Sequence, residues 1–287
     1  MATTIRNPIE WGYDQLRHAV VAVEVTNRAV RGSRYAVAAP QIRHIEIADL
    51  WDALRKGVSD FGAARSDVIF LCLLYPIAGL VLGRAVVGSG MLPLLFPLVS
   101  GFALVSPFVA VGLYEMSRQR ERGLDCNWAT AFDVVRSRSF AAIVMLGIVL
   151  TAIFVLWLLA AEGIYDATLG PKQPASFLGF VGDVFTTPQG RTMAVIGIGV
   201  GFIFALVAFA ISVVSFPLLL DRDVGLGTAI ATSVRAVLAN PIPMAVWAAI
   251  ISAGLVIGSL PFLLGLALVL PVLGHATWHL YRKVVAR

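Results

Sequence analysis

The chain has 287 residues, of which 59% are hydrophobic and only 14% are charged, and its mean hydropathy is +0.86. Soluble domains carry nearer a quarter charged residues, so this composition excludes an ordinary soluble domain and predicts an integral membrane protein. The formal net charge of +5 does not indicate nucleic-acid binding, because the basic residues are distributed as membrane topology requires.

Residues 1–42 are predicted to form a cytoplasmic tail ahead of a single membrane domain, residues 43–287. The opening string MATTIRNPIEWGYDQ has no apolar stretch behind a basic start, so we expect no cleaved secretory signal. Residues 8–30 carry apolar side chains at helical spacing, which is typical of an amphipathic helix that rests on anionic lipid or on a partner. A poorly ordered tail is the alternative.

The rest of the chain is dominated by apolar runs that are long enough to cross the roughly 30 Å hydrocarbon core, which takes about 20 helical residues. The last of them is too long for one helix and is divided by GSLP at residues 258–261, because proline removes a helical hydrogen bond and glycine permits a tight turn. The predicted fold is therefore all-α, a bundle of six transmembrane helices at about residues 68–87, 91–116, 140–161, 193–220, 242–259 and 261–281.

Lysine and arginine predict the orientation of these spans. Of the 22 basic residues, 19 lie in the N-terminal part, in segments 117–139 and 221–241, and after the last span. Basic residues concentrate in cytoplasmic loops, so we expect a bacterial inner-membrane protein with both termini in the cytoplasm.

A short amphipathic segment precedes each pair of predicted spans. These segments are too short or too polar to span, and we expect them to lie in the cytoplasmic interface, with Trp51 and Trp128 as anchors. The sequence thus predicts three repeats of an interfacial helix plus a transmembrane hairpin around a pseudo-threefold axis. The apolar positions are Ile47, Leu50, Trp51, Leu54, Val58 and Phe61 in the first segment, Trp128, Ala131, Phe132 and Val135 in the second, and Ile230, Val234, Val237 and Leu238 in the third.

Four strings resemble a known bacterial family of integral membrane proteins: DLWDALRKG, LPLLFPLVSGFALVSPFVAVGLYE, SVVSFPLLLDRDVG and PVLGHATWHLYRK. By these strings, about residues 43–287 are similar to the family catalogued as domain of unknown function 2189. The resemblance implies a multi-pass membrane protein. It brings no established activity, substrate or site residue.

Charged residues stand at the cytoplasmic ends of the second and fourth predicted spans: Glu115, Arg118, Asp221 and Arg222. Ionisable groups at membrane depth often mark a transport pathway, whereas near helix ends they usually pair or extend to the interface. We favour a structural ion-pair cluster that clamps the repeats together.

His275 and His279 lie four residues apart, hence on one face of the last predicted span. That spacing suits a shared metal ion or a haem ligand. We favour an interfacial belt in which Trp278, His279 and Tyr281 reach the lipid head groups, and His275 bonds to a neighbouring carbonyl or carboxylate. No catalytic set is found, and no cofactor or metal site is predicted.

Three hypotheses of function follow from these features. The first is a non-enzymatic accessory, assembly or scaffold subunit of a larger, possibly respiratory, membrane complex, with lipid and other subunits or further copies of the chain as partners. The second is a small-solute transporter or channel, suggested by the repeats and by prolines within spans. The third is a haem- or metal-binding redox protein that uses His275 and His279.

Overall fold

The computed structural model describes residues 40–286, apart from gaps at 73–76, 78–80, 82–83, 85–91, 125, 127, 171–173, 175 and 262. Every regular element in this part of the chain is a helix, and extended pairing is limited to a bridge between Ile42 and Val285. The all-α prediction is confirmed. The elements are α2 (Ile47–Cys72), η1 (Leu92–Leu94), α4 (Leu95–Val109), α5 (Val111–Glu121), η2 (Trp128–Arg136), α6 (Phe140–Thr168), α7 (Phe177–Thr186), α8 (Pro188–Ser212), α9 (Ser215–Asp221), α10 (Leu226–Ala239), α11 (Pro241–Ser259) and α12 (Leu266–Val284).

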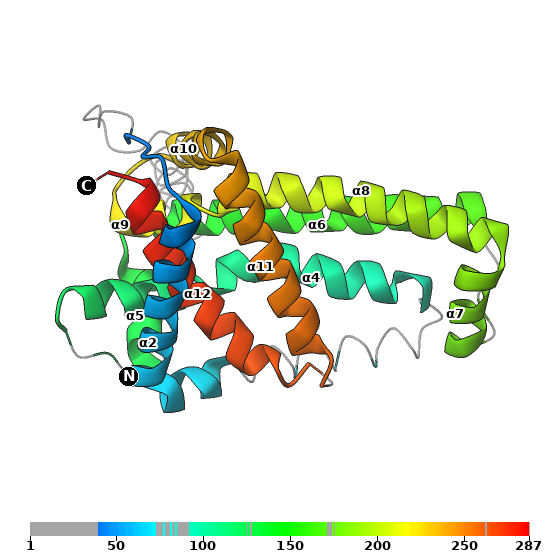
Figure 1. Cartoon of the computed structure of the whole chain (residues 1–287), viewed down its shortest axis with the longest axis horizontal. Coiled ribbons are helices and arrows are strands. Elements are labelled where there is room, and N and C mark those ends of the chain that lie inside the picture. The colour runs from blue at the N-terminus through cyan, green and yellow to red at the C-terminus, as the bar shows by residue number, and fades with distance from the viewer. Residues whose placement is uncertain are drawn as a thin grey trace, which may run out of the picture.

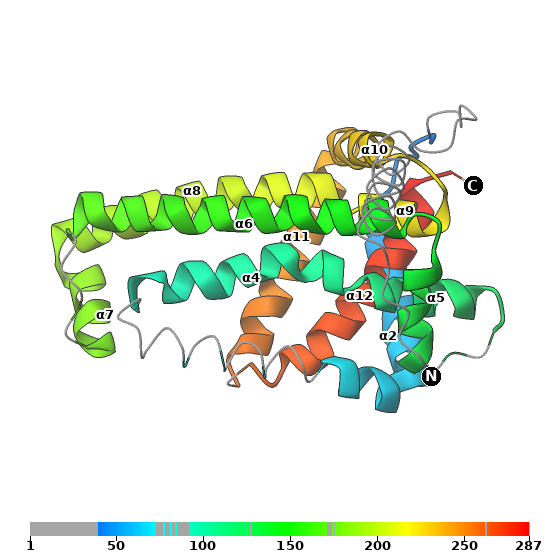
Figure 2. The same ribbon diagram turned by 180° about the vertical axis from the view of Figure 1, so that it is seen from behind.

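Helices α4, α6 and α8 run side by side and form the long body of the molecule (Figures 1 and 2). Their sequences are almost wholly apolar, so in hydrocarbon only a helix satisfies their backbone hydrogen bonds. Contact between α4 and α6 is close at Gly147, where an added Cβ would stand 2.7 Å from the ring of Phe108. The indole of Trp157 on α6 donates to the carbonyl of Pro97 on α4 at 3.0 Å.

Shorter elements lie across the two ends of this body. Helix α7 crosses the far end, and α2, α5, α9 and α10 gather at the other end, together with the described C-terminus (Figure 1). The three segments with amphipathic patterns correspond to α2, to the 3-10 helix η2 and to α10. Polar and basic residues are thus collected away from the long apolar helices.

Four helical stretches in the described residues are long and apolar enough to cross a membrane: Leu95–Glu121, Phe140–Thr168, Pro188–Asp221 and Pro241–Ser259. They correspond to the second to fifth predicted spans. The first predicted span, 68–87, falls largely outside the described residues, and the six-span count and the threefold repeat are not confirmed.

The sixth predicted span, 261–281, corresponds to α12, which is not among these four stretches. The N-terminal half of α12 is apolar, but its C-terminal half carries His275, His279 and Arg282 and packs against α2 and α5. An apolar helix can be buried in the protein interior as well as in lipid. The apolar sequence alone therefore does not distinguish a transmembrane span from a helix buried in the protein.

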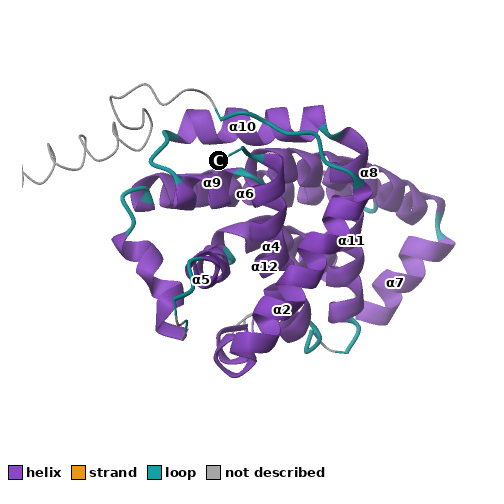
Figure 3. Ribbon diagram, turned by 60° about the vertical axis from the view of Figure 1, so that its left-hand side comes forward, coloured by secondary structure: helices purple, strands orange, loops and turns teal. Residues whose placement is uncertain are grey.

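The contact between α2 and α12 organises the polar end of the molecule (Figure 3). Leu50 and Ala53 of α2 and Trp278 of α12 are fully buried there. Gly57 allows the helices to approach, because a Cβ at this position would stand 2.7 Å from the Cβ and the backbone nitrogen of Ala276. Small residues at a crossing let helix backbones come this close.

Residues 41–45 are fastened to both the C-terminus and the start of α11. The Arg43 amide donates to Val284 O at 2.7 Å. The buried Asn240 side chain accepts from the Ile45 amide at 2.9 Å and donates to Arg43 O at 3.1 Å. These bonds fix where α2 begins relative to α12.

Candidate functional site

Three helices bring four polar side chains together at this end of the molecule: Asp60 from α2, Ser117 from α5, and His275 and His279 from α12. All four are buried or nearly so, with Ser117 and His275 only 1% exposed. His275 and His279 share a helix face as their spacing predicts. Asp60 reaches them because it continues the face of α2 that carries the small residue Gly57.

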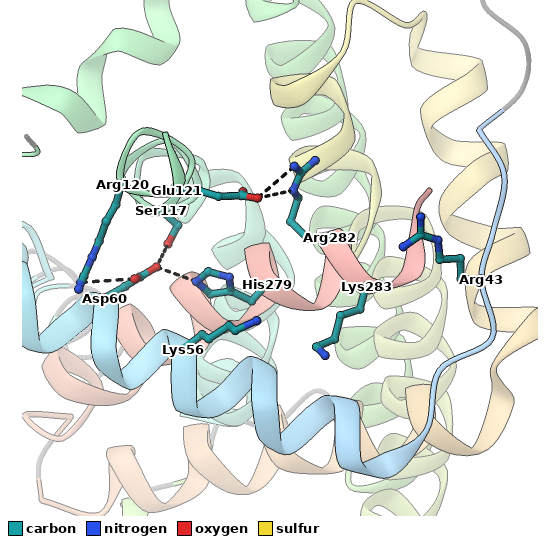
Figure 4. Close-up of a pocket in the computed structure, with 9 residues that line it drawn as sticks. All are labelled: Arg43, Lys56, Asp60, Ser117, Arg120, Glu121, His279, Arg282 and Lys283. Atoms are coloured by element: carbon teal, nitrogen blue, oxygen red, sulfur yellow. Dashed lines mark hydrogen bonds and ion pairs between the residues drawn. The ribbon is translucent and has the colours of Figure 1, made fainter. Parts of the chain in front are cut away.

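Asp60 is the centre of the hydrogen bonds (Figure 4). Its Oδ2 atom accepts from Ser117 Oγ at 2.6 Å and from His279 Nε2 at 2.8 Å, and Arg120 Nη1 lies 3.4 Å from Oδ1. Burial alone would raise the pKa of Asp60, but the hydrogen bonds from His279 and Ser117 outweigh it and lower the pKa below its usual value. The side chain is therefore a carboxylate at neutral pH.

Because Asp60 is ionised, the directions of the hydrogen bonds made by Ser117 and His275 are determined. A carboxylate only accepts, so the hydroxyl proton of Ser117 goes to Asp60. His275 Nδ1, 2.8 Å from Ser117 Oγ, must then carry a proton and donate it to that oxygen. In a neutral His275 the Nε2 atom is then unprotonated; it is buried near the backbone of Leu113 and makes no hydrogen bond within the described part of the chain.

This polarity runs opposite to that of a catalytic serine. A serine nucleophile gives its proton to an imidazole that accepts it, with a carboxylate behind the imidazole. Here Ser117 stands between the carboxylate and the imidazole of His275, and the imidazole donates to it. The arrangement is a hydrogen-bonded chain from Asp60 to a buried imidazole, not an activated nucleophile.

A cavity of about 490 Å³ opens beside this chain and is lined mainly by charged side chains (Figure 4). Asp60, Ser117 and His279 form part of its wall. The other lining residues come from the start of the described chain and from α2, α5 and α12: Arg43, Lys56, Arg120, Glu121, Arg282 and Lys283.

Several short ion pairs line the side of this cavity that α12 forms. Lys283 Nζ lies 2.9 Å from both Asp49 and Asp52 of α2. Hydrogen bonds to these two carboxylates raise the pKa of Lys283, and hydrogen bonds from Lys283 and Lys56 lower the pKa of Asp52 to about 2. Arg282 lies 3.1 Å from Glu121 and 3.2 Å from Asp221.

The four charges predicted to cluster form two pairs, one on α5 and one at the end of α9. Arg118 pairs with Glu115 at 2.8 Å on the same helix, and its Nη1 donates to Leu220 O of α9 at 2.9 Å. Asp221 and Arg222 are neighbours 3.9 Å apart, and Arg222 also donates to Ala286 O.

The ion pair that joins α9 to α12 involves one of these four residues and one residue outside the predicted cluster. Asp221 binds Arg282, and its carboxylate also accepts from Tyr281 at 2.7 Å. Arg282 was not predicted as a member of the cluster, although it follows Trp278 by one helical turn.

The predicted aromatic anchors are placed in two different ways. Trp51 is 60% exposed on α2, as an interfacial anchor requires. Trp278 and Tyr281 are buried, with their rings 5.4 Å apart, and the Trp278 indole donates to Glu121 at 3.2 Å. Their polar atoms meet carboxylates of this chain rather than lipid head groups. The side chain of Trp128 lies outside the described residues.

No set of three histidine, cysteine or carboxylate side chains among the described residues is placed to hold a metal ion. His275 bonds to Ser117 and His279 to Asp60. Asp60 and Ser117 were not singled out from the sequence. A signal was present, because Ala53, Gly57 and Asp60 recur at helical spacing and mark a face of α2 that another helix approaches closely.

The model of a family described as "Predicted integral membrane protein (DUF2189)" matches residues 95–221. This part of the chain is similar to that family. The resemblance inferred from the sequence is thereby confirmed over α4 to α9. Ser117 lies inside the DUF2189 match, and Asp60, His275 and His279 lie outside it. No curated protein and no solved structure matches the chain.

Proposed function

We propose that this protein is a non-enzymatic accessory, assembly or scaffold subunit that packs against a larger complex in the bacterial inner membrane. The observation that carries the proposal is the open lateral surface of α8. Only 6% of the residues in the most apolar part of Pro188–Asp221 are buried inside the chain. Among the described residues, no atom lies within 4 Å of the position that a Cβ would take at Gly197 or Gly199 on this helix. Small residues on an open helix face allow another helix to approach.

The proposed placement in the membrane has six spans, the polar end in the cytoplasm and α7 on the periplasmic side. The basic residues at the polar end support this orientation. An interfacial helix comes before two long helices both at η2, α6 and α8, where the short α7 lies between the long helices, and at α10, α11 and α12, and this order supports a repeat. No bound cofactor forms part of the proposal.

The direction of the hydrogen bond at Ser117 supports a non-enzymatic role, because Ser117 Oγ donates its proton to Asp60. A serine in that state is not activated for attack.

Native gel electrophoresis and co-purification in mild detergent, from membranes that express the protein at its natural level, test the proposal. We expect a complex larger than the free chain, with other membrane subunits in it. Gly199→Leu places a bulky side chain on the open face of α8 and is expected to release the chain from this complex.

Gly163→Leu on α6 is the matched control, because Gly163 also has no atom near its Cβ position but lies on another helix. It is expected to leave the complex intact. Migration of the wild-type chain only as a monomer or as a homomer would contradict the accessory role.

A small-solute transporter is the second candidate, and the hydrogen-bonded chain from the cavity to His275 favours it. Asp60, Ser117 and His275 connect an open cavity to a buried proton acceptor, a pattern found in proton relays. In proteoliposomes with an internal pH dye, a transporter is expected to give a proton flux that depends on added solute and that Ser117→Ala abolishes. If no added solute changed the internal pH, the transporter function would be excluded.

A further inference from the structure

We propose that the cavity between α2, α5 and α12 binds a phosphate-type anion, carried by a lipid head group or by a soluble phosphate. This goes beyond the accessory role and does not depend on it. Five basic side chains line the cavity against two carboxylates, Asp60 and Glu121. These five side chains differ in how far neighbouring carboxylates neutralise them.

Two of the basic side chains are already neutralised by their neighbours. Arg282 lies between Glu121 and Asp221, at 3.1 and 3.2 Å. Lys283 lies between two carboxylates of α2, each at 2.9 Å. These two residues shape the cavity but hold little unsatisfied charge.

Of the other three basic side chains, Lys56 and Arg43 are less well compensated. Lys56 has one partner, Asp52 at 3.0 Å, which it shares with Lys283, and 53% of its side chain is exposed. Arg120 is held against α2, because its Nη1 atom donates to Ser59 O at 2.8 Å and lies 3.4 Å from Asp60. In the described part of the chain, no carboxylate lies within ion-pair distance of the Arg43 guanidinium.

The two less compensated cations come from separate elements: Arg43 from the segment before α2 and Lys56 from α2, whereas Arg120 extends from α5 to Asp60 (Figure 4). An anion with several oxygens can accept from more than one donor, and guanidinium and ammonium groups make strong charge-assisted bonds to phosphate. The cavity of about 490 Å³ far exceeds the roughly 30 Å³ of one water, so it also has room for part of the group that bears the phosphate.

The position of the cavity suits both sources of phosphate. Trp51 and Val58 on α2 are 60% and 54% exposed, as expected for a helix that rests in the membrane interface. Lipid head groups lie at that depth. The cavity also lies at the polar end of the molecule, where a soluble phosphate can reach it.

The experiment uses the full chain purified in neutral detergent, with one arm for each source. The first arm titrates inorganic phosphate by calorimetry. The second arm reconstitutes the chain in nanodiscs of phosphatidylcholine with and without phosphatidylglycerol and measures retained phosphatidylglycerol by native mass spectrometry. Binding in the first arm alone identifies a soluble phosphate, and retention in the second alone identifies a lipid head group.

In the arm that shows binding, Lys56→Gln and Arg43→Gln are each expected to weaken it about tenfold, the effect of losing about 1.4 kcal/mol. Arg55→Gln is the matched control, because Arg55 is exposed on the same helix as Lys56 and does not line the cavity, and its substitution removes the same charge. Lys56→Arg keeps the charge and is expected to retain binding.

No binding in either arm would overturn the proposal. So would an equal loss in Arg55→Gln and Lys56→Gln, because that result would show general surface attraction instead of a site.

Discussion

Replacing Gly57 by alanine is expected to destabilise the protein, because this glycine lies where α2 touches α12. The added Cβ would stand 2.7 Å from the Cβ and the backbone nitrogen of Ala276 and 2.8 Å from its Cα. These atoms belong to the backbone of a packed helix or are bound directly to it. The clash therefore cannot be relieved by rotating a side chain, and the two helices must move apart.

The size of the effect follows from two opposing contributions. Overpacking of this kind costs about 3 kcal/mol, at the upper end of the usual range, because backbone must shift. Alanine is a better helix former than glycine by about 1 kcal/mol, which offsets part of that cost. The expected net loss in the free energy of unfolding is therefore about 2 kcal/mol.

Gly62 provides the control on the same helix. A Cβ at Gly62 meets no atom of the described residues within 4 Å, so Gly62→Ala gains the helix propensity alone and is expected to stabilise the protein by about 1 kcal/mol. Unfolding in mixed micelles of dodecyl maltoside and sodium dodecyl sulfate, followed by far-ultraviolet circular dichroism, measures both. If Gly57→Ala were as stable as Gly62→Ala, α2 would not pack on α12 as described.

Three further predictions concern the polar end. Ser117→Ala removes the acceptor for the buried Nδ1–H of His275 and is expected to lower the free energy of unfolding by roughly 2 kcal/mol in the same assay, whereas no change would refute the proton assignment. Asn240→Ala is expected to speed proteolysis within residues 41–45, because it breaks the bonds from Asn240 to this segment; cleavage at the wild-type rate would contradict that role. The Asp52–Lys283 pair is expected to add less than about 1 kcal/mol, since Asp52 is partly exposed. The folded pKa of Asp52, about 2, lies below its unfolded value, so this stability is present above about pH 4 and is lost as the pH falls toward 2. A pH titration of unfolding should show a smaller loss in Lys283→Gln, in which Lys56 still pairs with Asp52.

The sequence predicted the apolar helices well, because length and hydropathy are local properties. The predicted span 242–259 is α11, Pro241–Ser259, within one residue, and 140–161 begins where α6 begins. The predicted span 193–220 is divided into α8 and α9. The division leaves the amide of Val214 without a helical partner, and it donates instead to Ser233 Oγ of α10 at 3.1 Å. That partner lies in a distant segment, so no local pattern indicated it.

The candidate site was harder to predict, because its partners are far apart in the chain. Asp60 and His279 are 219 positions apart, and Ser117 and His275 are 158 apart. Periodicity placed Asp60 on the polar side of an amphipathic helix and His279 near the head groups. Both side chains are polar, and hydropathy does not distinguish a polar atom that meets water from one that meets another helix.

The claim on which the whole account depends is that the polar end of the molecule and α7 lie on opposite sides of a membrane. Cysteine accessibility tests it directly, in a background with Cys72 and Cys126 replaced by serine. Ser176→Cys, just before α7, and Arg235→Cys, on α10, both lie at exposed positions. In intact bacterial spheroplasts, an impermeant maleimide is expected to label Ser176→Cys at once and Arg235→Cys only after permeabilisation. Labelling of both from the same side would contradict the account.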